Sequence, residues 1–346
     1  MRRWRIARAV RVVPVVCALL GGCEGSDAAD GGTDAAAADA SAVDAGPDGG
    51  GRPRPPSADL VTFNVGTTPF IDFLGRADYR ADCRDWYDNN LCLQAAEDAV
   101  RDELAALEPR FILLQEMWFA DGCTEADRPP RADEPPFVCA LEGRPIERVL
   151  PAGFGHACAT AHPDNCVGFD RDAFTVEDEA ASCDGRDCAA ALVGVDADCG
   201  GPSRSAILRG RTDDGPLALV VLHLNAGPTP EDQACRAAQL EALRLALDAE
   251  VDGGAALLIG GDFNFDPAVT DGPDTEAFEA LVGDHGLSRL ADDPAVETNR
   301  LLEADIDFFL ARGLPGQEAS ECTQRFVDGH LDAPFFDHAL VSCALE

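Results

Sequence analysis

Several apolar segments of this chain carry or end in a polar side chain that could bind a cation or exchange a proton. The segment LLIGGDFNFDP, residues 257–267, runs from apolar residues through two glycines to Asp262 and Asn264. Carboxylate and amide oxygens suit hard cations such as Mg²⁺, and a histidine among them can donate or accept a proton. The residues that share this placement are Asn64, Glu116, His223, Asp262, Asn264, Asp307, Asp337 and His338.

Each of these residues, taken alone, also has a purely structural explanation. Asn64 can be a turn residue at a strand end, and Glu116 can mark the point where a strand meets water. Asp262 and Asn264 can be turn formers after Gly-Gly, and His338 can be a core histidine. The set of residues, rather than any member, therefore carries the functional argument.

Other acidic and histidine residues are expected to lie outside the chemistry. In EADIDFF, Asp305 shares a face with Asp307, and we expect Asp305 to be the solvated acid of the two. The remaining histidines are expected in loop-like contexts, without a catalytic role: His156, His162, His285 and His330.

The elements that must position the polar set alternate between strands and helices, which predicts an α/β fold with buried sheets and outer helices. Apolar spacing predicts a helix over residues 92–107, and another over 230–249 opened by Pro230. Residues 118–205 are rich in Pro, Gly, Asp and Cys and are expected to form long disulfide-pinned loops around short strands such as CVGF. Strands are predicted at residues 59–65, 111–116, 217–224, 255–261, 306–311 and 337–343.

The polar motifs occur in the order found in the endonuclease/exonuclease/phosphatase superfamily, which the chain resembles over about residues 58–343 with the middle loops unmatched. TFNV resembles the opening strand, LLQEMW the metal-binding glutamate motif, and VVLHLN the strand with the active-site histidine. RAAQLEAL resembles the Arg-x-x-Gln-Leu helix that follows in many members. GGDFNFDP matches the Gly-Asp-Phe-Asn motif, and DIDFFL and FDHALV resemble the Ile-Asp-Tyr and closing Asp-His motifs.

This resemblance implies a four-layered α/β sandwich, in which two packed mixed β-sheets are flanked by helices. It implies a hydrolase that breaks phosphoester bonds with a divalent cation, Mg²⁺ or else Mn²⁺ or Ca²⁺. The implied metal ligands are Glu116, with Asn64 beside it, and Asp337.

The resemblance also implies catalytic roles. Asp262 would orient or deprotonate the attacking water, and Asn264 would hold the phosphate. His338 would contact a phosphate oxygen while Asp307 fixes its tautomer, and His223 would donate to the phosphate or assist the leaving group. The pattern leaves open which residue is the general base.

Three positions depart from the family pattern and bear on substrate choice. Members often have Thr where this chain has Leu222, Ser where it has Phe336, and Arg where it has Asp305. The acids, amides and histidines of the motifs all remain.

The N-terminal segment is predicted to direct export and membrane tethering. Arginines precede an apolar run at residues 12–20 that is too short to span a bilayer, and the following Leu-Gly-Gly-Cys resembles a bacterial lipobox. Cys23 would then be lipidated, and an ordinary signal peptide cut nearby is the alternative. The expected boundaries are a signal peptide at 1–22, a disordered Ala/Asp/Gly/Pro tether at 23–57 and the catalytic domain at 58–346.

The chain has 14 cysteines, of which Cys17 and Cys23 belong to the export signal. The remaining even number, in an exported domain, indicates disulfides rather than a metal site. Sequence does not determine the connectivity, but short loops favour the pairs Cys83–Cys92, Cys123–Cys139, Cys158–Cys166 and Cys183–Cys188, which leaves Cys199–Cys235 and Cys322–Cys343.

The formal net charge is −36 and the chain has no lysine. A field of that sign repels polyanions at low salt, which favours a lipid head group or small phosphodiester as substrate over nucleic acid. A secreted disulfide-rich nuclease is the alternative, which a stripe formed by Arg204, Arg209 and Arg211 near the site would support. A hydrophobic loop formed by Phe70, Ile71, Phe73 and Leu74 near the site would instead favour a lipid.

A protein of another class, a catalytically inactive surface binding module, would have lost some motif residues, and none is lost here. The expected localisation is a membrane-anchored lipoprotein, periplasmic or on the cell surface, with its phosphoester substrate and the membrane as partners. No protein partner is implied.

Overall fold

The computed structural model describes residues 58–66, 94–117, 144–159, 165–199, 204–291, 297–299, 302, 304–327 and 336–346. The chain divides into two units, residues 1–51 and 52–346, and every described residue belongs to the second. The predicted signal peptide, the lipidated Cys23, the tether and the apolar loop at residues 70–74 lie outside the described residues, as do His162 and His330.

Within the described part of the chain, no helix combines the length and the hydrophobicity needed to cross a bilayer.

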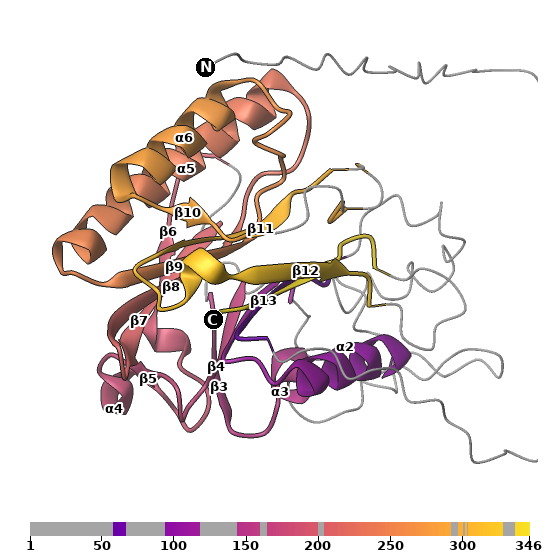
Figure 1. The fold of residues 1–346 in the computed structure, drawn as a ribbon, viewed down its shortest axis with the longest axis vertical. Coiled ribbons are helices and arrows are strands. Elements are labelled where there is room, and N and C mark those ends of the chain that lie inside the picture. Colours follow the sequence, from indigo (N-terminus) through magenta and orange to yellow (C-terminus); the bar gives the residue numbers. More distant parts are fainter. Residues whose placement is uncertain are drawn as a thin grey trace, which may run out of the picture. The chain divides into compact units, whose positions relative to one another are not determined.

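Two mixed β-sheets form the centre of the fold (Figure 1). The first sheet has the strand order β12-β13-β1-β2-β4-β3, and the second has the order β10-β11-β9-β8-β7-β5, with β6 also paired to β7. In the first sheet the strands are β1 Leu60–Asn64, β2 Phe111–Gln115, β3 Phe154–Cys158, β4 Cys166–Asp170, β12 Glu321–Arg325 and β13 Leu340–Ala344. In the second they are β5 Thr175–Val176, β6 Leu192–Val195, β7 Ser205–Thr212, β8 Gly215–His223, β9 Ala256–Asp262, β10 Ser288–Arg289 and β11 Asp307–Arg312.

Helices cover the outer face of each sheet. The helices are α2 Gln94–Leu107, α3 Pro145–Val149, α4 Glu179–Ser182, α5 Pro230–Asp252 and α6 Pro273–His285, with short 3₁₀ turns η5 Ala189–Ala191 and η6 Gln317–Ala319. One apolar cluster joins α2 and α3 to the first sheet, a second lies between the two sheets, and a third joins α5 and α6 to the second sheet. The predicted four-layered α/β sandwich is therefore confirmed.

The central strands are apolar throughout because both of their faces are buried. In β2, Phe111 and Leu113 point into the cluster between the sheets, whereas Ile112 and Leu114 point into the helix-facing cluster. Side chains alternate across a strand, so a strand between two layers needs apolar residues at every position. This requirement explains runs such as FILLQ and LALVVLH.

The strand register brings the predicted polar residues to one edge of the sandwich. In the first sheet β1 runs parallel to β2, and Asn64 pairs with Gln115, the residue before Glu116. In the second sheet β8 runs parallel to β9, and His223 pairs with Asp262. Antiparallel β11 begins with Asp307, which also pairs with Asp262.

Several predicted elements differ from the structure. The described part of residues 118–205 contains α3, β3, β4, β5, α4 and β6, so it holds more regular structure than expected, and the predicted short strand CVGF is present as β4. The strand β7 and the helix α6 were not predicted at all. The apolar residues of α6 are confined to residues 277–282, where Ala277, Phe278, Leu281 and Val282 pack on the cluster beside the second sheet. The sequence therefore shows no apolar repeat along the whole helix. The closing strand begins at Leu340 rather than at residue 337.

Four of the six predicted disulfides lie in the described part, and all four are present. They are Cys158–Cys166, Cys183–Cys188, Cys199–Cys235 and Cys322–Cys343. The pairs Cys83–Cys92 and Cys123–Cys139 lie outside the described residues. Disulfides at this density indicate a chain that folds in an oxidising environment.

His156 and His285 were expected to lie in loops, and this expectation is wrong. His285 ends α6, and His156 is buried in β3. The guanidinium of Arg144 donates to Nε2 of His156 at 2.9 Å, and arginine can only donate, so this imidazole is neutral with its proton on Nδ1. Burial lowers the pKa of His156; nearby Asp187 and Glu147 oppose this shift, while Arg144 and Arg186 reinforce it.

We expect the buried His156 to make the stability of the fold depend on pH. The folded state disfavours the imidazolium, so it binds fewer protons than the unfolded chain around the ordinary histidine pKa of 6.5. The stabilising contribution is therefore complete above that value and is lost as the pH falls through it. Urea unfolding between pH 8 and pH 5.5 should show a steeper loss of unfolding free energy in the wild type than in His156→Gln. Equal slopes in the two proteins would contradict the assignment.

Candidate active site

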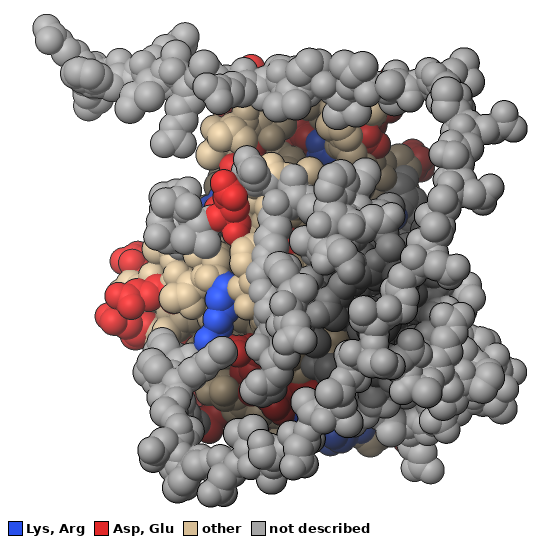
Figure 2. All heavy atoms as spheres, turned by 90° about the vertical axis from the view of Figure 1, so that its right-hand side faces the viewer, with Lys and Arg blue, Asp and Glu red and all other residues tan. Residues whose placement is uncertain are grey.

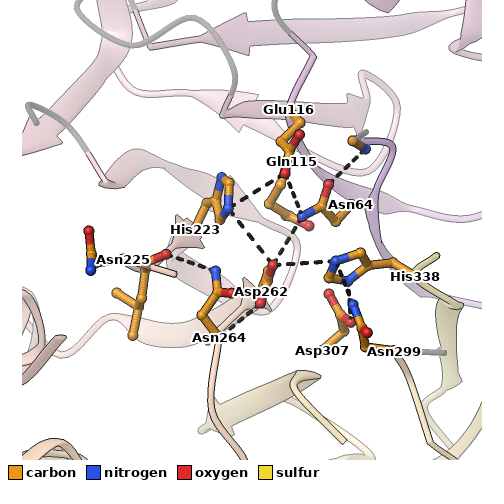
Figure 3. A network of polar contacts seen from close by, with 12 residues as sticks. Asn64, Gln115, Glu116, His223, Asn225, Asp262, Asn264, Asn299, Asp307 and His338 are labelled. Carbon is orange, nitrogen blue, oxygen red and sulfur yellow. Dashed lines mark hydrogen bonds and ion pairs between the residues drawn. The ribbon is translucent and has the colours of Figure 1, made fainter. Parts of the chain in front are cut away.

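Side chains from both sheets meet at the shared edge of the sandwich (Figure 3). Asn64 comes from the end of β1 and Glu116 from the residue after β2, while His223 and Asp262 end β8 and β9. Asn264 follows β9, Asp307 begins β11, and Asp337 and His338 lie shortly before β13. All eight predicted site residues therefore lie at one edge, although they span residues 64 to 338 of the sequence.

Asn64 links the two sheets through its amide group. Its Nδ2 donates to Oε1 of Glu116 at 3.2 Å and to Oδ2 of Asp262 at 3.0 Å. Its Oδ1 accepts the backbone N–H of Gly66 at 2.8 Å, which fixes the orientation of the amide. Asn64 is buried, and its contacts hold carboxylates from opposite sheets beside each other.

Glu116 stands in a left-handed backbone conformation, with φ of 57°, directly after β2. Such a conformation is uncommon for a residue with a side chain and is retained where the surroundings require it. A Cβ atom on Gly66 would lie 2.0 Å from Oε2 of Glu116, so the absence of a side chain at residue 66 makes room for the carboxylate. Burial raises the pKa of Glu116, an effect that His223 and His338 oppose.

The Asp262 carboxylate is fixed at both oxygens. Oδ1 accepts the backbone N–H of Asn264 at 2.7 Å, and Oδ2 accepts from Asn64. Oδ2 also lies 3.8 Å from Nε2 of His223 and 3.8 Å from Nε2 of His338. These two distances exceed the length of a hydrogen bond. The carboxylate and the two imidazoles therefore face a common point without bonding directly to each other.

The glycines before Asp262 are required by close packing. Gly261 has φ of 146°, and a Cβ there would lie 2.0 Å from the carbonyl oxygen of Leu222 on β8. A Cβ on Gly260 would lie 2.5 Å from the ring of Phe309. The Gly-Gly pair therefore lets β9 lie close to its neighbours and bring Asp262 to the edge of the sheet.

His338 and Asp307 form a buried pair. Nδ1 of His338 lies 2.8 Å from Oδ2 of Asp307, and Oγ1 of Thr298 accepts the backbone N–H of Asp307 at 2.9 Å. Burial raises the pKa of Asp307 to about 6, and Asp262 adds to this shift while His338 opposes it. Burial alone would lower the pKa of His338, but the carboxylates of Asp307, Asp262 and Asp337 outweigh burial and raise it well above the ordinary value.

Asn264 and His223 occupy the rim of the site. Asn264 has φ of 56°, and its Nδ2 donates to the carbonyl of Leu224 at 2.8 Å. Nε2 of His223 lies 3.8 Å from Oε1 of Glu116, the same distance as from Oδ2 of Asp262. The segments after β8 and β9 are thus tied to each other at the point where their side chains reach the site.

The donor set suits a divalent cation. Both carboxylate oxygens of Asp337 are buried and make no hydrogen bond within the described part of the chain. The same is true of Oδ1 of Asp307. Buried carboxylates normally pair with donors or a cation. Asp262, Asp307 and His338 can also each offer one ligand atom within 4.8 Å of the others, so this buried group could hold a metal. The group differs from the predicted ligand set of Glu116, Asn64 and Asp337, which stays a prediction.

Asn299 was missed by sequence reasoning. It is buried, and its Nδ2 lies 3.0 Å from Nε2 of His338. Its Oδ1 accepts the backbone N–H of Leu302 at 2.9 Å, which directs the amide NH₂ towards the imidazole. No local sequence pattern predicts this contact, because Asn299 and His338 are brought together by an isolated β-bridge between segments that are distant in the sequence.

Asp305 is not solvated, contrary to the sequence-based expectation. It is buried and forms an ion pair with Arg289, whose guanidinium carbon lies 4.1 Å from the ring centroid of Phe308. Arg289 ends β10 and lies 16 residues before Asp305 in the sequence, so the pairing could not be read from the local sequence. Phe336, where the resembled family often has Ser, is buried against Phe63 with ring centroids 5.0 Å apart.

Comparison with known proteins identifies the fold. No protein-family model matches the sequence, and no curated protein matches it. The structure is similar to that of truncated TDP2 from Caenorhabditis elegans, with a TM-score of 0.51 and 15% identity over 83% of this chain and 96% of that chain. It is also similar to a conserved protein of unknown function from Enterococcus faecalis V583, with a TM-score of 0.51 and 12% identity over 83% of this chain and 99% of that chain.

At 15% identity the likeness concerns the fold. The sandwich expected from the motifs is the architecture that the structure shows.

We expect Asn299 to keep the pKa of His338 lower than the carboxylates alone would set it. An amide NH₂ facing Nε2 needs an unprotonated nitrogen as acceptor, so it disfavours the imidazolium. Asn299→Ala should raise the pKa of His338 and Asn299→Asp should raise it further, measured by NMR titration of the ring in metal-free protein. A fall of the pKa in Asn299→Ala would show that the amide stabilises the charged ring instead.

Proposed function

We propose that this protein is a divalent-metal-dependent phosphodiesterase that hydrolyses a lipid head group or small phosphodiester. The observation that carries the proposal is the Asp262 carboxylate, held by Asn64 and facing the imidazoles of His223 and His338 at 3.8 Å each. A carboxylate and two imidazoles around one point offer an acceptor for the proton of water and donors for phosphate oxygens. The motif order and the sandwich fold support the same conclusion.

A divalent cation, Mg²⁺ or else Mn²⁺ or Ca²⁺, would neutralise charge on the phosphate and stabilise the leaving oxygen. We assign its ligands to Glu116 and Asp337, with Asn64 beside them. The buried oxygens of Asp337, which make no hydrogen bond within the described residues, support this assignment. The group formed by Asp262, Asp307 and His338 offers an alternative place for the ion.

The protein side chains would share the remaining chemistry. Asp262 orients or deprotonates the attacking water, because Asn64 and the Asn264 backbone fix both of its oxygens. His338 would contact a phosphate oxygen, with Asp307 bound to its Nδ1 and fixing its tautomer. His223 donates to the phosphate or assists the leaving group, and Asn264 helps to hold the phosphate. Catalytic hydrogen bonds are often long in a substrate-free site, which agrees with the 3.8 Å spacing.

Charge favours a small or lipid-derived substrate over a polyanion. The net charge is −36. Arg204 lies beside β7 at the site, where its carbonyl accepts the backbone N–H of His223. Arg209 and Arg211 lie further from the site, because in the strand register they are opposite Ala218 and Pro216, towards the start of β8. Arg209 is also paired with Glu250. On the coloured part of the face in Figure 2, basic side chains do not join into a continuous stripe.

We further propose that the catalytic domain is displayed outside the cytoplasm. The disulfides support an oxidising environment. The lipobox-like sequence before Cys23 supports a lipid anchor, with residues 23–57 as tether and residues 58–346 as catalytic domain.

The direct test is hydrolysis by the disulfide-intact chain with and without EDTA. Bis-p-nitrophenyl phosphate, sphingomyelin, plasmid DNA and RNA are assayed side by side. Asp262→Ala and His338→Ala should each lower kcat by about 10²–10⁴-fold, the usual contribution of a positioned acid–base group. Asp213→Ala, in the exposed turn between β7 and β8, is the matched control and should keep full activity.

Each outcome of this assay assigns the substrate class. Metal-dependent turnover of the lipid or small diester alone supports the proposal. Cleavage of DNA or RNA that is lost in Asp262→Ala would make the protein a nuclease. No turnover of any substrate by folded protein would favour a phosphomonoesterase or an inactive binding module. Near wild-type rates in Asp262→Ala would contradict the site assignment.

Gly66→Ala should impair the metal-dependent step by displacing Glu116. The added Cβ would fall 2.0 Å from Oε2 of Glu116, so the carboxylate must move away from its place beside Asn64. We expect activity to need a higher Mg²⁺ concentration, measured by titrating the ion in the diester assay. Gly283→Ala is the control, because a Cβ there meets nothing within 4 Å. An unchanged Mg²⁺ requirement in Gly66→Ala would argue against Glu116 as a ligand.

A further inference from the structure

The Arg-x-x-Gln-Leu segment of α5 contains a buried charge that the proposed reaction does not use. Arg236 is 2% exposed, and its Nε and one terminal nitrogen donate to Oδ2 of Asp274 at 3.0 and 2.7 Å. Asp274 is fully buried in the first turn of α6. Replacing such a pair by apolar residues is often neutral for stability, so stability alone does not account for it.

The other terminal nitrogen of Arg236 holds the segment that follows His223. It donates to the carbonyl of Asn225 at 3.0 Å and to the carbonyl of Gly227 at 2.7 Å. One helical turn further on, Oε1 of Gln239 accepts the backbone N–H of Asn225 at 2.9 Å. Both backbone polar groups of Asn225 are therefore bound by side chains of α5.

Gly227 makes this approach possible. Its φ is 116°, and a Cβ there would lie 2.2 Å from Oδ2 of Asp232 in the first turn of α5. The segment can therefore lie directly on the start of the helix, where its carbonyl reaches Arg236.

Arg236 also contacts the segment that follows Asp262. Its guanidinium carbon lies 5.5 Å from the ring centroid of Phe265, the residue after Asn264. Asn264 in turn donates to the carbonyl of Leu224, which follows His223. One guanidinium thus touches the segments after both β8 and β9, which carry residues from the second sheet into the site.

The start of α5 is itself anchored. The disulfide Cys199–Cys235 joins the residue before Arg236 to the segment after β6, and Nε2 of Gln239 donates to the carbonyl of Cys199 at 3.5 Å. Arg236 and Gln239 therefore project from a helix turn with little freedom to move.

We propose that the buried Arg236–Asp274 pair, together with Gln239, is a positioning group that holds the segments after β8 and β9 and so places His223 and Asn264 for catalysis. This inference rests on the proposed function for its catalytic part. The holding of residues 225–227 does not depend on that function.

The test uses two variants and a matched control in the full chain. Arg236→Lys keeps a positive charge beside Asp274 but cannot bind the carboxylate and two carbonyls together, because lysine lacks the planar fork. The double variant Arg236→Met with Asp274→Asn leaves no unpaired buried charge if the single change fails to fold. Arg244→Met removes an arginine from the same helix whose partners, Glu241 and Asp284, lie on the surface.

Two measurements separate positioning from general stability. We expect kcat on the diester to fall by about 100-fold in the Arg236 variants, as a displacement of catalytic groups by about 1 Å can cause. We also expect faster hydrogen exchange at the amide of Asn225, with the amides of β8 unchanged. Arg244→Met should match the wild type in both.

An unchanged rate of hydrogen exchange at the backbone amide of Asn225 in folded Arg236 variants would overturn the proposal. Faster exchange at this amide with an unchanged kcat would also overturn it. If the wild-type chain hydrolyses none of the substrates, the proposed function fails. The positioning claim is then decided by exchange at Asn225 and by the NMR shifts of the His223 ring, which must move in the Arg236 variants for the claim to stand.

Discussion

The site depends on keeping four carboxylates close together where little water reaches them. Asp262, Asp307 and Asp337 are buried and Glu116 is 24% exposed, so their mutual repulsion is poorly screened. The surrounding residues offset this repulsion in particular ways. Asn64 donates to two of the acids, His338 bonds a third, and the oxygens of Asp337 make no hydrogen bond within the described residues. A fold that brings these acids together has a strong electrostatic reason to bind a cation.

The sandwich supplies the geometry for this arrangement. Parallel β1 and β2 end beside each other in one sheet, and parallel β8 and β9 do so in the other. The apolar layer between the sheets holds their ends together, and Asn64 completes the link by bonding Glu116 of its own sheet and Asp262 of the opposite one. The core therefore determines the distances within the site, which makes core packing and site geometry inseparable.

A second group of residues holds the site residues, or the segments that carry them, in place. Asn299 orients the imidazole of His338, and Arg236 binds the segments that follow β8 and β9. The partly exposed Arg289 pairs with the buried Asp305 and lies against Phe308, which belongs to the strand that begins with Asp307. Each contact joins segments that belong to different elements. Segments that carry side chains to a site need such support, because backbone beyond a strand end has no ladder hydrogen bonds of its own.

The sequence by itself determined the central strands and α5, because apolar periodicity is a local property. The order of its motifs also indicated the sandwich class and eight of the side chains that meet at the site. The sequence also indicated the four described disulfides. Tertiary structure alone decided that Asp305 is buried, that Asn299 faces His338 and that Arg236 pairs with Asp274. It also decided that α6, which contains a fully buried aspartate, is a helix. These features depend on pairings between residues distant in the chain, and a residue's partner is set by how the layers pack.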